Sequence, residues 1–91
     1  MEYDKKIEYA TRINAILRGE PDYTVLKCLE VPDRPDWYLM KVFHIIVSGD
    51  DIVVRGTELK SNYGRCCNIE NVVAVYTQND DKLLKLFDVE R

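Results

Sequence analysis

Residues 37–54, WYLMKVFHIIVSGDDIVV, decide the fold. Two apolar runs flank the polar segment SGDD at residues 48–51. Gly49 can supply the positive φ that the first position of a two-residue type II′ turn requires. The stretch therefore predicts a β-hairpin at the centre of the protein, with its first strand running from Trp37 to Val47.

The turn also sets the register of the hairpin, and the Lys41–Glu58 pair, of opposite charge, supports it. The expected pairs are Val47 with Ile52, Ile45 with Val54, Phe43 with Gly56 and Lys41 with Glu58. The predicted core face consists of Phe43, Ile45, Val47, Ile52 and Val54. The other face mixes apolar and polar residues: Met40, Val42, His44, Ile46, Val53, Arg55, Thr57 and Leu59.

The first strand is too long to be straight. At about 3.3 Å per residue it would extend roughly 36 Å. A chain of this size has a radius of gyration of about 12 Å and is only about 31 Å across. The strand must therefore coil, contain a bulge or project from the domain, and strong coiling favours a curled, barrel-like sheet.

The remaining chain predicts one helix and further strands. Apolar residues recur at steps of three and four over residues 4–18, and Gly19 and Pro21 end this amphipathic helix. Its apolar stripe consists of Tyr3, Ile7, Ala10, Ile13, Ile16 and Leu17. Residues 23–89 then predict a β-meander, with further strands at 23–31, 65–69, 71–78 and 82–89. The last of these also fits one face of a helix.

The sequence thus predicts a single α+β domain over residues 1–91. An N-terminal amphipathic helix is followed by a curled, mostly antiparallel sheet of five or six strands. This order of elements is compatible with small Sm-like or SH3-like barrels, an analogy that transfers no site residue.

Composition narrows the function classes. A net charge of −3 and a pI near 5.1 count against non-specific nucleic-acid binding, which needs a strongly basic face. The first six residues are not followed by an apolar run, and no stretch is long enough to span a bilayer. Three cysteines, two of them adjacent, argue for free thiols in a reducing, cytoplasmic setting.

No residue set predicts catalysis, a metal or a cofactor. His44 faces Arg55, which disfavours a protonated ring and indicates a half-buried structural histidine. Cys66 and Cys67 point to opposite faces of a strand, so one should fill the core and the other lie near the surface. Cys28, His44 and one of this pair could meet in space, although their spacing does not require it. An enzyme using His44 with a cysteine is therefore the third-ranked hypothesis.

A polar cluster follows the hairpin and is the best candidate for a ligand site. Its members are Arg55, Lys60, Asn62, Tyr63 and Arg65. The cations could contact phosphate while Tyr63 stacks on a base, which gives a nucleic-acid or nucleotide-binding module as the alternative function. A solvated connection with ordinary charges is the favoured interpretation, because the cluster is small and the chain is acidic.

Surplus apolar area gives the leading hypothesis. The hairpin has a second, partly apolar face, and the strand at 71–78 is apolar on both faces, which is more than one short helix covers. The sequence therefore predicts a non-enzymatic regulator or inhibitor that docks on a larger protein or self-associates, with a dimer expected and no membrane partner. The candidate contact residues are Trp37, Met40, Val42, His44 and Leu59.

Overall fold

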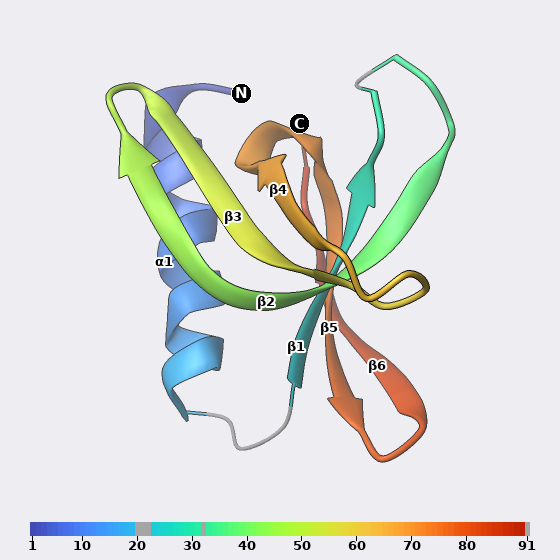
Figure 1. Ribbon diagram of the computed structural model, residues 1–91. Coiled ribbons are helices and arrows are strands. Elements are labelled where there is room, and N and C mark those ends of the chain that lie inside the picture. Colours follow the sequence, from blue (N-terminus) through green and yellow to red (C-terminus); the bar gives the residue numbers. More distant parts are fainter. Residues whose placement is uncertain (20–22, 32, 91) are drawn as a thin grey trace.

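The computed structural model describes residues 1–19, 23–31 and 33–90, and contains helix α1 (Tyr3–Gly19) followed by six strands (Figure 1). The strands are β1 (Tyr23–Leu29), β2 (Trp37–Ser48), β3 (Asp51–Glu58), β4 (Gly64–Asn68), β5 (Val72–Asn79) and β6 (Lys82–Asp88). A short 3₁₀ helix, η1 (Ile69–Asn71), separates β4 from β5. The predicted order of elements is confirmed, and the last segment is a strand rather than a helix. The predicted helix stop at Pro21 lies outside the described residues.

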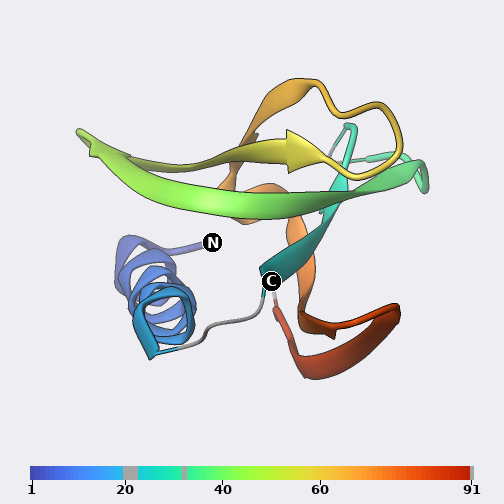
Figure 2. The same cartoon turned by 60° about the horizontal axis from the view of Figure 1, so that its bottom comes forward.

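All six strands form one sheet in the order β4-β3-β2-β1-β5-β6, and each neighbouring pair is antiparallel. The sheet curls strongly, so that the β2–β3 hairpin and the β5–β6 hairpin lie on two sides of a concave space (Figure 2). Helix α1 lies on the open side of that space, beneath the β2–β3 hairpin (Figure 2). The curl expected for a small barrel is present, but the sheet stays open and ends at β4 and β6.

The core fills the concave side of the sheet and is closed by α1. Its fully buried side chains include Ile13 from the helix. The facing sheet residues are Leu26, Cys28, Met40, Val42, Ile52, Val54, Cys67, Val72 and Val75. The burial of Ile52 and Val54 confirms their predicted place on the core face of the hairpin.

The buried face of α1 is rotated relative to the predicted stripe. Tyr3 and Ile7 are exposed, whereas Lys6 and Tyr9 are buried. Lys6 can lie there because its Nζ donates to the Asp50 carbonyl at 3.2 Å and pairs with the Glu70 carboxylate at 3.1 Å. Through this hydrogen bond and this ion pair, the buried lysine connects the start of the helix to the β2–β3 turn and to η1.

The hairpin register is confirmed near the turn and wrong farther away. Gly49 has a φ of +60°, and Val47 pairs with Ile52 as expected. A β-bulge at Phe43 then shifts the pairing by one residue. Lys41 pairs with Thr57 instead of Glu58, so the predicted opposite-charge pair is wrong. The bulge also provides the bend that the length of the strand required.

One extra residue in β2 reverses the face to which each side chain points in the part of the strand that lies before the bulge, farther from the turn. Met40 and Val42, predicted on the mixed face, are buried in the core at 0% and 5% exposure. Phe43, predicted in the core, is 58% exposed because it occupies the bulge. Val47 is also exposed, since it lies beside the turn and borders an open groove against α1.

Candidate functional site

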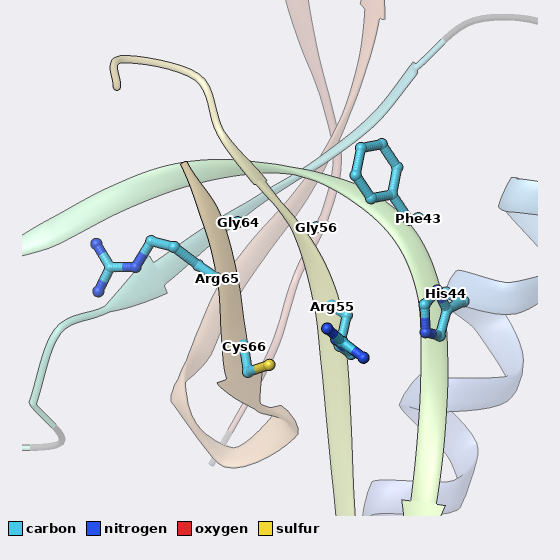
Figure 3. A pocket seen from close by; sticks show the side chains of 7 residues that line it. All are labelled: Phe43, His44, Arg55, Gly56, Gly64, Arg65 and Cys66. Carbon is cyan, nitrogen blue, oxygen red and sulfur yellow. The ribbon is translucent and has the colours of Figure 1, made fainter. Parts of the chain in front are cut away.

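A shallow depression of about 380 Å³ lies on the convex face of the sheet, over β2, β3 and β4. It is lined by Phe43, His44, Arg55, Gly56, Gly64, Arg65 and Cys66 (Figure 3). Gly64, two residues before Cys66 on β4, contributes no side chain to this face. His44, Arg55 and Cys66, all candidate residues from the sequence, line it.

His44, Arg55 and Cys66 form a row across three strands. His44 pairs with Arg55, and Arg55 pairs with Cys66, so all three side chains share the convex face (Figure 3). Because neighbouring strands are about 4.8 Å apart, Arg55 separates the histidine and the thiol by roughly 10 Å between backbones. A general base must lie within hydrogen-bond reach of its nucleophile. The row therefore provides no Cys–His pair, and His44 is exposed rather than half-buried as expected.

Arg65 turns away from that row and belongs to an ion-pair cluster (Figure 3). Its guanidinium donates to both carboxylate oxygens of Glu30, at 2.8 and 2.7 Å, and to Glu58 at 3.2 Å. It also stacks on the Tyr38 ring, with 3.6 Å between its Cζ and the ring centroid. Two carboxylates already neutralise this arginine, so it is not a free phosphate ligand.

The predicted polar site is therefore not assembled. Arg55 and Arg65 point to opposite faces of the sheet. Arg55 pairs with Cys66 and Arg65 pairs with Gly56, so the two arginines occupy adjacent positions of the β3–β4 ladder, where side chains alternate between faces. Lys60, Asn62 and Tyr63 lie in the exposed loop after β3, where Asn62 has a positive φ of 62°. The five residues thus lie at one end of the sheet, but their side chains do not point toward a common site.

Ion pairing at Arg65 predicts an acid-sensitive contribution to stability. The hydrogen bonds from Arg65 hold the pKa of Glu30 below its ordinary value. A carboxylate with a lowered folded-state pKa stabilises the fold above its unfolded pKa and loses that effect as pH falls through the folded value. We expect Glu30→Gln to lower the melting temperature slightly at pH 7 and not at all in strong acid, since the Glu30 side chain is 40% exposed.

Thermal denaturation followed by circular dichroism at both pH values checks this. The control is Glu90→Gln, an exposed carboxylate outside any ion pair among the described residues. Equal loss of stability by Glu30→Gln at neutral and acidic pH would contradict the assigned role of the ion pair.

The candidate partner residues are divided between core and surface. Met40 and Val42 are buried, which removes them from any contact surface. Leu59 is partly buried, and Trp37 is 53% exposed beneath the Lys27 amine, 4.4 Å from the ring centroid. These residues do not form one continuous surface with His44.

The largest run of exposed apolar side chains lies instead on β6, at the free edge of the sheet. Leu83, Leu84 and Leu86 are 37%, 53% and 44% exposed. Leu86 occupies a bulge, because Val75 pairs with Phe87 and Tyr76 already pairs with Lys85. The periodicity of this segment was visible in the sequence, but its position at an open edge depends on the strand order.

A buried thiol cluster lies at one end of the core, next to the ion-pair cluster. The Cys28 and Cys67 side chains both belong to the buried core, where Cys28 pairs with Tyr38 across β1 and β2 and the Cys67 thiol donates to the Asn68 carbonyl at 3.3 Å. The nearby Cys67 thiol and burial raise the pKa of the Cys28 thiol. Cys66 is exposed. The prediction of one core thiol and one surface thiol in this pair is confirmed.

Among residues 1–19, 23–31 and 33–90, no three or more His, Cys, Asp or Glu side chains cluster in a way that would hold a metal ion. None of the helices in these ranges is long and apolar enough to cross a membrane. Comparison with known proteins gives no match: no family model fits the chain, and no curated sequence or solved structure is significantly similar to it.

Proposed function

We propose that this protein is a non-enzymatic interaction protein that pairs with a second copy of itself along the free edge of β6. The observation that carries the proposal is the position of β6 at the end of an open sheet. An edge strand leaves backbone N–H and C=O groups without a strand partner, and soluble proteins rarely leave such an edge apolar and uncovered. Added strands are a common way to satisfy these groups.

The β6 sequence is complementary to itself in an antiparallel arrangement. With Lys85 on a two-fold axis, Lys82 of one copy faces Asp88 of the other. Leu84 then lies near Leu86 of the other copy, which occupies the β6 bulge, so exposed leucines from both copies lie at the contact. A two-fold contact of this kind is the usual basis of homodimers.

Lysines on an edge strand generally oppose pairing, and β6 contains Lys82 and Lys85. Here Lys85 is already paired with Asp88 of its own strand at 3.1 Å, which reduces repulsion across the axis. The charges of β6 therefore favour an antiparallel register over a parallel one, in which lysines would face lysines.

The two alternative functions have weaker support. A nucleic-acid or nucleotide site would need Arg65, which two carboxylates neutralise. An enzyme would need His44 near a thiol, and Arg55 lies between His44 and Cys66. We therefore infer a role as a regulator or inhibitor, acting in the cytoplasm, where the free thiols of this chain remain reduced.

Size-exclusion chromatography with light scattering over a range of protein concentrations tests the pairing. We expect a concentration-dependent dimer, and we expect Leu84→Lys to weaken it at least about tenfold, the equivalent of about 1.4 kcal/mol. Lysine at this position would face Leu86 of the other copy and leave a charge in an apolar contact.

Val47→Lys is the matched control, because Val47 is an equally exposed aliphatic residue on a strand remote from β6. It should leave the dimer unchanged. A wild-type protein that stays monomeric at millimolar concentration would refute self-pairing, and so would a dimer that Val47→Lys disrupts and Leu84→Lys does not. A protein that is monomeric and binds a larger protein through β6 would refute self-pairing, while β6 would remain the contact surface.

A further inference from the structure

The convex face of β2–β4 is positively charged, although the chain as a whole is acidic. His44 and Arg55 share this face, and Lys41 lies on it as well, because its partner Thr57 is two residues from Arg55. All residues of these three strands are described, and Asp51 beside the turn is the only carboxylate that the register places on the face. Four residues of extended strand, roughly 13 Å, separate it from Arg55. The negative charges of the chain therefore lie elsewhere.

Arg55 has no anionic partner. Its cross-strand neighbours are His44 and Cys66, and neither is a carboxylate. No hydrogen bond or ion pair joins its guanidinium to any residue in the described part of the chain. Arg65 on the neighbouring strand is, in contrast, paired with two carboxylates. Arg55 is exposed, so its N–H groups remain available to an acceptor from outside the chain.

Apolar side chains lie on both sides of Arg55. Phe43, in the β-bulge, is 58% exposed and lines the same depression as Arg55 (Figure 3). In the other direction along β3, Val53 precedes Arg55 by two residues and pairs with Ile46, and both are half-buried. Such alternate residues of a strand are about 7 Å apart. The face therefore presents one unpaired cation between two apolar contacts.

We propose that this face is a docking site for an acidic segment of a partner protein. A carboxylate of that segment pairs with the Arg55 guanidinium and accepts a hydrogen bond from the adjacent His44 imidazole (Figure 3). Apolar side chains of the same segment cover Phe43 on one side and Ile46 with Val53 on the other. Arginine and aromatic residues are the types enriched at contacts between proteins.

The ratio of charge to apolar area favours a peptide over a nucleic acid or a membrane. A nucleic-acid strand carries a charge at every nucleotide and binds through several basic contacts. An anionic membrane surface likewise attracts clusters of lysine and arginine. Arg55 is the only arginine that the register places on this face of β2–β4, all of whose residues are described. An acidic peptide needs only one well-placed carboxylate and gains further affinity from apolar burial.

This inference rests on the proposed role as an interaction protein and specifies the chemistry of the larger partner. It does not depend on pairing through β6, because β6 and β4 are at opposite ends of the strand order. We expect Leu84→Lys to bind the peptide as tightly as the wild-type protein. Failure of the dimer would therefore leave this site unaffected, and failure of this site would leave the dimer unaffected.

Selection from a displayed library of random peptides against the immobilised protein tests the site. We expect the enriched peptides to contain more Asp and Glu than the unselected library, together with aromatic or aliphatic residues. Fluorescence anisotropy with labelled synthetic copies then measures affinity. Arg55→Glu should weaken binding at least about tenfold, because a carboxylate would face the carboxylate of the peptide. Phe43→Ala should weaken it at least about threefold through loss of apolar contact.

Arg18→Glu is the matched control, because it makes the same charge change at an exposed arginine on α1, which lies on the concave side of the sheet (Figure 2). It should change affinity by less than about twofold. Equal weakening by both charge reversals, enriched peptides without an acidic excess, or a selection that enriches no peptide would overturn the proposal. Tighter Arg55-dependent binding of oligothymidylate or of phosphatidylserine vesicles would also overturn it. The selection uses only the wild-type protein, so its result does not depend on the folding of a variant.

Discussion

Replacing Gly56 by alanine is expected to destabilise the protein by at least about 3 kcal/mol. A Cβ at this position would overlap the Lys41 carbonyl oxygen. It would also lie 2.9 Å from the Lys41 carbonyl carbon and 3.0 Å from Met40 Cγ. The conflict is with backbone on β2, so the hairpin would have to separate at the point where it bends around the core.

Urea denaturation followed by far-UV circular dichroism measures this effect. Gly64→Ala on the neighbouring strand is the matched control, because the nearest atom to its added methyl group is the Gly56 carbonyl oxygen at 4.0 Å. We expect the control to change stability by less than about 0.5 kcal/mol. Similar unfolding midpoints for both variants would mean that β2 does not approach Gly56 as closely as the structure places it.

Replacing Ile13 by alanine is expected to cost about 3 to 4 kcal/mol. Ile13 is fully buried and is the largest side chain that α1 places completely inside the core. Its removal leaves a cavity between the helix and the concave side of the sheet, which the flanking residues Tyr9 and Ile16 cannot fill without moving. Urea denaturation again provides the measurement.

Ile7→Ala in the same helix is the control, because it deletes the same atoms with the same change in helix propensity. Ile7 is 38% exposed, and we expect its replacement to cost less than about 1 kcal/mol. Equal costs at the two positions would show that α1 does not bury the face observed here.

Local signals in the sequence were sufficient for the type and order of the elements. The turn at Gly49 fixed the hairpin, since glycine accepts its φ of +60° without strain. The helix was also predictable, because Ala10, Ile13 and Leu17 recur at helical spacing. Its rotation was not, since Lys6 is buried by partners on the β2–β3 turn and η1, which are distant in sequence.

The bulge at Phe43 could not be located from the sequence. The strand length required a bend, but Val42, Phe43 and His44 include no glycine or proline to mark its position. Because successive side chains of a strand point to opposite faces, one extra residue places Met40 and Val42 in the core instead of on the predicted mixed face. Two of the five candidate contact residues were therefore misplaced by a single backbone feature.

The candidate sites depended still more on long-range arrangement. Strand alternation predicts that one of Cys66 and Cys67 points inward, but which one depends on the pairing of β4 with β3. The exposure of β6 depends on the strand order. The pairing of Arg65 with Glu30 joins residues 35 positions apart, which no local pattern encodes.

The place of β1 in the sheet has a consequence for folding kinetics. β1 is hydrogen-bonded to β2 on one side and to β5 on the other, with Tyr23 opposite Gln78. The β2–β3 hairpin closes over a short loop and can form in about 1–10 μs. Joining β5 to β1 requires closure of a much longer loop, so its entropic cost falls late in folding. During synthesis β1 can therefore pair with β2 first and gains its second partner only after β5 has left the ribosome.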